Sequence, residues 1–86
     1  MPAPLTLINR FELLLVNSPA SLSAVLGEFA ARDVSPTSVN AVSQGSGNLA
    51  VTVIVKRLGE NSARCIEQKL KAVPAVKQAR LEHMVN

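Results

Sequence analysis

The amino-acid sequence predicts an α+β domain in which a four-stranded antiparallel sheet carries two helices on one face. Three observations lead to this prediction. Four segments have the alternation or the β-branched composition of strands, and two others repeat apolar residues every three or four positions. The segments follow one another as βαββαβ, and right-handed crossovers then place both helices on the same side of the sheet.

The four strands are expected over residues 7–16, 37–43, 49–58 and 76–84. The first becomes apolar on both faces toward Val16, which is typical of an inner strand. The third is the clearest, because its alternate positions are apolar and β-branched. Its inward side chains are expected to be Leu49, Val51, Val53 and Val55. Residues 44–48 are small or polar, include two glycines, and predict the turn of a hairpin.

The first helix is expected over residues 19–32, with Ser18 as N-cap and Pro19 at the first helical position. Its core stripe is expected to be Leu22, Val25, Leu26, Phe29 and Ala30. The second helix is expected to begin near residues 59–61, with Asn61 as its cap, and to end before Pro74. Its core stripe is expected to be Ala63, Ile66, Leu70 and Val73. Glu67 and Lys71 are expected on its solvent side, in the favoured i, i+4 order.

The length of 86 residues fits one domain, residues 1–86, with a core over about residues 6–84. One cysteine excludes an intrachain disulfide, so the fold needs no oxidising compartment. No apolar run approaches the ~20 residues of a membrane helix. The first four residues lack the basic segment of a signal peptide. We therefore expect a cytoplasmic protein that does not bind membranes.

The net charge of +3 is concentrated in residues 56–86, which hold seven basic and three acidic side chains. Proteins that read single-stranded nucleic acid stack bases on aromatic side chains, and this segment has none. The basic residues are also interleaved with acidic ones. We therefore expect a solvated face here and no nucleic-acid partner.

The sequence offers few residues for catalysis. His83 is the only histidine and is expected at the surface, and Cys65 is expected to be an inert side chain beside the second helix's core stripe. No carboxylates have catalytic spacing, since Glu60 and Glu67 lie two turns apart on a solvated helix. We therefore expect no catalytic residue, no metal site and no cofactor in this chain.

Two surfaces predict association with other chains. The first and third strands are apolar on both sides, so apolar area left on the open sheet face is expected to be buried in a homodimer. The first helix carries small residues opposite its core stripe: Ala20, Ala24, Gly27 and Ala31. Gly27 costs ~1 kcal/mol relative to alanine inside a helix, which suggests that another chain lies close to it.

The predicted order of elements is that of the ferredoxin-like sandwich, a fold that serves many functions. Two families with this fold are excluded, because the sequence lacks the residues that their functions need. A metal carrier needs Cys-x-x-Cys in the first loop, and residues 17–21 contain no thiol. An RNA-recognition domain needs aromatic side chains on its middle strands, and residues 49–58 contain none.

Two blocks of residues carry a family resemblance that spans roughly residues 9–82. The first block is Asn17 followed by Leu22, Ser23, Val25, Gly27, Phe29 and Arg32, with Ser38 six positions further on. The second block is residues 66–71, which lead to Val76. These blocks resemble the ACT domain, a small-molecule-sensing module of amino-acid metabolism. More narrowly, they resemble the regulatory small subunit of acetolactate (acetohydroxyacid) synthase.

The resemblance implies an effector site in the first loop, shared with a second chain. Its expected residues are Asn17, Ser18, Ala20, Ser21, Leu22 and Ser35. Ala20 and Ser35 differ from the residues usual in the family. Pro19 and residues 38–40 resemble the short form of the subunit, which supports its catalytic partner without valine feedback. The expected partner interface consists of Ala24, Gly27, Ala31 and Asn40.

The sequence is compatible with three functions. The first is a regulatory subunit that activates the thiamine-diphosphate-dependent large subunit of acetolactate synthase in branched-chain amino-acid biosynthesis, with all cofactors in that partner. The second is a free-standing ACT domain that binds an amino acid or another small carboxylate at a dimer interface. The third, an enzyme in its own right, has the least support in the composition.

Overall fold

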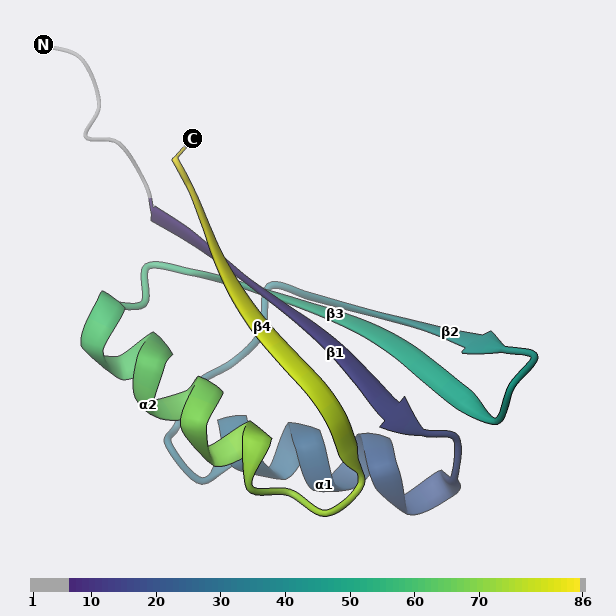
Figure 1. The fold of residues 1–86 in the computed structure, drawn as a ribbon. Coiled ribbons are helices and arrows are strands. Elements are labelled where there is room, and N and C mark those ends of the chain that lie inside the picture. The colour runs from purple at the N-terminus through teal and green to yellow at the C-terminus, as the bar shows by residue number, and fades with distance from the viewer. Residues whose placement is uncertain (1–6, 86) are drawn as a thin grey trace, which may run out of the picture.

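The computed structural model describes residues 7–85 as a four-stranded antiparallel sheet in the order β2-β3-β1-β4, with two helices on one face (Figure 1). The elements are β1 (Leu7–Val16), α1 (Pro19–Ala30), β2 (Ser38–Gln44), β3 (Asn48–Lys56), α2 (Glu60–Lys71) and β4 (Val76–Val85). The predicted fold class is confirmed. The expected domain limits 1–86 and core limits 6–84 include residues 1–6 and 86, which lie outside the described residues.

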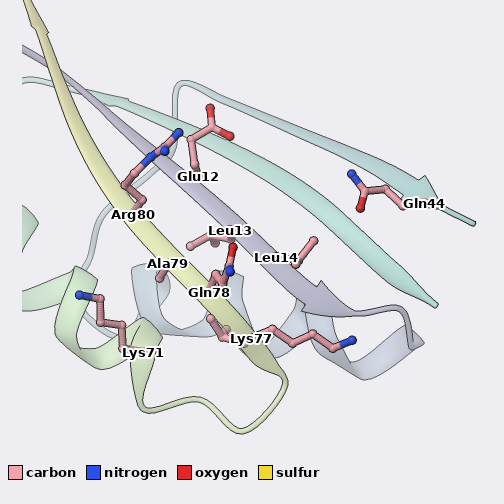
Figure 2. Close-up of a pocket in the computed structure, with 10 residues that line it drawn as sticks. Glu12, Leu13, Leu14, Gln44, Lys71, Lys77, Gln78, Ala79 and Arg80 are labelled. Atoms are coloured by element: carbon pink, nitrogen blue, oxygen red, sulfur yellow. The ribbon is translucent and has the colours of Figure 1, made fainter. Parts of the chain in front are cut away.

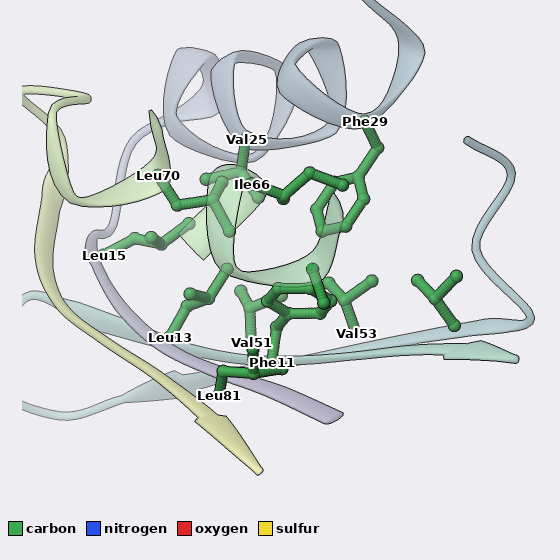
Figure 3. Close-up of a cluster of buried hydrophobic side chains, with 12 residues drawn as sticks. Phe11, Leu13, Leu15, Val25, Phe29, Val51, Val53, Ile66, Leu70 and Leu81 are labelled. Carbon is green, nitrogen blue, oxygen red and sulfur yellow. The ribbon is translucent and has the colours of Figure 1, made fainter. Parts of the chain in front are cut away.

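The core lies between the sheet and the helices and is centred on β1. Phe11 of β1 stands opposite Val53 of β3 and Leu81 of β4, so the three side chains share the helix-facing side. The Phe11 ring meets Phe29 of α1 edge-on, with ring centroids 5.2 Å apart and planes at 84° (Figure 3). The predicted inner position of β1 is therefore confirmed, as is the inward face of β3.

Helix α1 is rotated relative to the expectation. Leu22 and Leu26 are only half-buried, and Ala30 is exposed. The row that faces the sheet consists of Ser21, Val25 and Phe29, four positions apart. Ser21 belongs to this row because its hydroxyl lies 3.2 Å from that of Ser18, which gives the buried oxygen a partner. Because serine is polar, the hydropathy pattern of the sequence did not predict that this row of α1 is the buried one.

The C-terminus of α1 is Ala30 and not Arg32. The Arg32 guanidinium Nη1 donates to the backbone oxygen of Glu28 at 2.9 Å and to its Oε2 at 3.0 Å. A basic side chain that binds a last-turn carbonyl stabilises the end of a helix. Asp33 then takes a positive φ of 57°, which carries the chain away toward β2.

Helix α2 buries Ala63, Ile66 and Leu70 as predicted, but four other expectations about this part of the chain are wrong. Its N-cap is Gly59 and not Asn61. Glu67 is 7% exposed and faces β4, because its Oε2 accepts a hydrogen bond of 3.1 Å from the Leu81 amide. Val73, the fourth expected member of the stripe, follows the end of the helix and is half-buried. Cys65 lies beside the stripe and is exposed. His83 is half-buried, since it lies on the helix-facing side of β4 opposite Asn9.

The open face of the sheet carries charge at its centre and exposed apolar side chains toward its ends, which include Val16, Val42 and Met84. Arg10 stands opposite Glu82 and Glu12 stands opposite Arg80, which gives an alternating pattern across β1 and β4. Ion pairs also join Arg10 to Glu12 and, at 2.9 Å, Arg80 to Glu82. These four residues are named the charged quartet. Alternating opposite charges suit a face that remains in water.

Strand β3 ends at Lys56, two residues before the expected limit, because Arg57 has a φ of 63°. This left-handed conformation is costly for a residue with a Cβ. We expect Arg57→Gly to stabilise the domain by about 0.5–1 kcal/mol, since glycine removes the strain but adds unfolded-state entropy. The midpoint of urea unfolding is the measurement.

The neighbouring exposed position supplies the control. Lys56→Gly places the same residue in extended backbone and is expected to destabilise by about 0.5–1 kcal/mol. Two changes of the same sign would contradict the assignment of strain to Arg57.

Candidate functional site

The β1–α1 turn, residues 17–22, leaves the N-terminus of α1 open. Ser18 occupies the N-cap with extended backbone (φ −140°, ψ 156°), and Pro19 takes the first helical position, as predicted. The Ser18 hydroxyl makes no capping hydrogen bond, because it faces Ser21 instead. The first turn of α1 holds no acidic residue. The positive end of the helix dipole is therefore not compensated by its own side chains.

Asn17 connects this turn to the β2–β3 hairpin. Its Nδ2 donates to the Ser43 hydroxyl at 2.8 Å, and its backbone N–H donates to the Gly47 oxygen at 3.0 Å. Gly47 has a φ of 77°, which the tight hairpin turn requires and glycine adopts freely. Asn17 thus holds the hairpin tip beside the N-terminus of α1.

The expected effector residues do not form one cluster within the chain. Asn17 and Ala20 are exposed at the N-terminus of α1, Ser18 and Leu22 are half-buried there, and Ser21 is only 2% exposed. Ser35 follows the other end of α1, and a helix of 12 residues is about 18 Å long. Ser35 can join the turn only if it comes from a second chain.

Ser35 lines a shallow hollow of about 570 Å³ between the end of α1 and the start of β2. Leu26 and Ala30 contribute from α1, and Ser38 and Val39 contribute from β2. The hollow exists because no helix covers β2, so Val39 is 40% exposed although it lies on the helix-facing side. The sequence pattern did not predict this hollow, since Val39 belongs to an ordinary strand pattern.

The expected interface residues Ala24, Gly27 and Ala31 are all exposed, and Asn40 is exposed on β2. The α1 residues Ala24 and Gly27 and the C-cap residue Ala31 form a surface without charge together with Ala20, Ser23 and Ala30, and we name it the uncharged face of α1. A Cβ atom added at Gly27 would meet nothing within 4 Å. Packing within the chain therefore does not require this glycine.

A wider groove of about 800 Å³ extends from the open face of the sheet past β4 to Lys71 at the end of α2, and it was not predicted (Figure 2). Leu14, Gln44 and Gln78 line it together with four charged side chains. Three of the four charged groups have an ion-pair partner: Glu12 pairs with Arg10, Arg80 with Glu82, and Lys71 with Glu67. Lys77 donates a hydrogen bond to the neutral amide oxygen of Asn48.

Within residues 7–85, no group of three or more His, Cys, Asp or Glu side chains could hold a metal ion. The two acidic residues of α2 both contact Arg64, Glu60 at 3.9 Å and Glu67 at 3.2 Å. In the same range, no helix combines the length and apolar character needed to cross a bilayer.

Comparisons with solved structures agree with this geometry. The ACT domain from GTP pyrophosphokinase of Chlorobium tepidum is similar as a solution structure (TM-score 0.70, 11% identity, 94% of this chain and 89% of that chain). Its crystal structure is similar as well (TM-score 0.71, 10% identity, 90% and 96%). So is the C-terminal domain of the MgtC protein from Mycobacterium tuberculosis (TM-score 0.72, 11% identity, 91% and 87%). At these identities the likeness concerns the fold.

No curated protein sequence matches this chain significantly. The family profile described as the ACT-like domain matches residues 5–86, almost the whole chain. The βαββαβ order, the helices on one sheet face and the exposed β1–α1 turn agree with that match. The chain therefore belongs to the ACT-like domain family, whose members are regulatory domains that bind small molecules.

Proposed function

We propose that this ACT-like domain is a non-catalytic regulatory subunit that binds and activates the large subunit of acetolactate synthase, in branched-chain amino-acid biosynthesis. The resemblance of residues 17–38 and 66–76 to the small subunit of that enzyme supports the choice of partner. The thiamine diphosphate and the catalytic residues would belong to the large subunit. The chain would then act in the cytoplasm.

The main support for a regulatory role is the uncharged face of α1. A helix face in water usually carries charged side chains, and this one has only alanine, serine and glycine. Small side chains let another chain approach the helix backbone closely. Gly27 costs about 1 kcal/mol of helix stability relative to alanine, and no contact among residues 7–85 explains it. Ala24, Gly27 and Ala31 are accordingly proposed as the contact with the catalytic subunit.

A second candidate function is supported by the N-terminus of α1. Because no side chain caps it and its first turn holds no acid, it suits the carboxylate of a small effector. A free-standing domain would bind an amino acid or another small carboxylate there, at a dimer interface. Calorimetric titration with valine, leucine and isoleucine tests this function, and binding of none of them would remove these amino acids as effectors.

The test of the first function measures acetolactate synthase activity and complex formation with and without this chain. We expect the wild-type chain to bind and activate the large subunit, and Gly27→Gln to weaken the complex by about tenfold or more. The isolated variant should remain folded, because glutamine is the better helix former and its Cβ meets no neighbour.

Ser62→Gln places the same side chain on the exposed surface of α2 and serves as the control. Failure of the wild-type chain to bind or activate the large subunit would reject acetolactate synthase as the partner. Equal binding by Gly27→Gln and the wild type would reject the uncharged face of α1 as the contact.

A further inference from the structure

The groove on the open face of the sheet has a polar lining that depends on an irregularity in β4. Leu14 of β1 stands opposite Gln78. The next residue of β1, Leu15, stands opposite Val76. Lys77 therefore has no residue opposite it and forms a β-bulge. A regular strand directs consecutive side chains to opposite faces, whereas a bulge allows two consecutive side chains to share one face.

The bulge brings three polar side chains of β4 to the open face (Figure 2). Gln78 lies there together with Leu14, because the residues on either side of Leu14 are buried against the helices. Lys77 lies there as well, because its ammonium donates to the amide oxygen of Asn48 at the start of β3, on the other side of β1. Arg80 follows two positions after Gln78 and therefore shares its face.

Two cations of this groove have donors available for a further anion. Among residues 7–85, the Lys77 ammonium has no carboxylate partner, since its hydrogen bond goes to a neutral amide. The Arg80 side chain is 73% exposed and contacts Glu82 through Nη2 at 2.9 Å. A guanidinium group has five N–H donors, so most of those of Arg80 remain available. The third cation, Lys71, lies beyond β4 and is 3.9 Å from Glu67.

The rest of the lining is apolar, neutral or already engaged. Glu12 forms an ion pair with Arg10 and accepts a hydrogen bond of 3.1 Å from the Thr52 hydroxyl. Leu14 adds an apolar side chain, and Gln44 adds an amide from β2. Sites for small ligands combine apolar surface with a few well-placed polar groups. The lining therefore fits a small molecule with one anionic end and a short apolar part.

We propose that this groove binds a small carboxylate with a short apolar chain, with the carboxylate between Lys77 and Arg80 and the chain against Leu14. A carboxylate fits because a guanidinium group can bind both of its oxygens in parallel. A single negative charge fits because Glu12 and Glu82 on the same face would repel a second one.

The proposed site lies on the face of the sheet that the helices leave open, whereas the N-terminus of α1 lies on the helix side (Figure 1). It is therefore separate from the β1–α1 turn, and it does not depend on the catalytic partner proposed above.

Nuclear magnetic resonance of the full chain tests the site with hexanoate as the probe. The titration is made at constant ionic strength, and the side-chain amide signals of Gln44 and Gln78 report on the groove directly. We expect saturable shifts of these two signals and of the Leu14 backbone amide. The absence of saturable shifts, or shifts confined to residues 17–22, would overturn the proposal. The second of these results would instead support an effector site at the N-terminus of α1.

Exchange of the two cations tests how the carboxylate is held. Lys77→Gln and Arg80→Gln should each raise the dissociation constant of hexanoate by about threefold to tenfold, because each removes one charged contact. Both residues are exposed, so the variants should remain folded.

Lys56→Gln is the matched control for these two variants. Lys56 is exposed at the opposite end of β3 from Asn48, about 26 Å away along the strand. Its exchange should change the dissociation constant by less than about twofold, because salt screens charges at that distance. Equal effects of all three substitutions would indicate general charge attraction and would overturn the site.

Two further probes test the chemical class of the ligand. Acetate lacks the apolar chain and should bind more weakly than hexanoate by about threefold or more. Leu14→Ser should remove this difference, because it removes the apolar contact. Equal affinities of acetate and hexanoate for the wild type would reject the contact with Leu14. Tighter binding of inorganic phosphate than of hexanoate would reject the carboxylate.

Discussion

Phe11→Ala should lower the free energy of unfolding by about 3–5 kcal/mol, the largest effect that we expect from one substitution. Phe11 has no exposed surface, lies on the central strand and packs edge-on against Phe29. Its removal leaves a cavity at the point where sheet and helices meet. Domains of this size are stable by only about 4–13 kcal/mol, so the variant should be close to unfolding.

Urea unfolding followed by circular dichroism measures this loss. Val85→Ala, which shortens a largely exposed side chain, should change stability by less than about 0.5 kcal/mol and serves as the control. Both chains are measured at the same protein concentration. A loss below about 1 kcal/mol for Phe11→Ala would contradict its central place in the core.

The second large effect is expected for Asn9→Ala, at about 1–3 kcal/mol of lost stability. Asn9 is fully buried on β1, and its Nδ2 donates to the backbone oxygen of Leu58 at 2.9 Å and to that of Val55 at 3.5 Å. The amide thus fixes the strained turn at Arg57 against the sheet. Without the Asn9 amide, the backbone oxygen of Leu58 would lose its side-chain hydrogen-bond donor near the core.

Asn17→Ala is the matched substitution, since Asn17 also donates one side-chain hydrogen bond but lies in water. Its loss should cost less than about 1 kcal/mol, because water replaces the bond to Ser43. Thermal unfolding of both variants makes the comparison. An Asn9→Ala chain no less stable than Asn17→Ala would show that the buried amide contributes little.

The order of the elements and the pairing of the strands follow from the pattern of apolar and polar residues along short segments of the chain. The β-branched alternation of residues 49–55 and the apolar positions of β1 define the buried side of the sheet, because a strand's side chains alternate between faces. The cap and proline at Ser18 and Pro19 likewise define where α1 begins. The predicted ends of β2 and β3 differ from the structure by one or two residues. Strand β3 ends early because Arg57 takes a backbone conformation that no composition signal indicates.

The candidate site is predictable only in part. The exposure of Ala24, Gly27 and Ala31 follows from their spacing on one helix. The burial of Ser21 does not, because it depends on the rotation of α1 against the sheet. The separation of Ser35 from Asn17 follows from the length of α1, and only a second chain can remove it.

The sequence by itself determined the fold class, the position of β1 inside the sheet and the uncharged face of α1, since each depends on the periodicity of neighbouring residues. The tertiary structure decided where the polar groups go. It buried Glu67 against the Leu81 amide and Asn9 against the Leu58 oxygen, and it arranged the charged quartet across β1 and β4. These contacts join residues distant in the chain, so no local pattern encodes them.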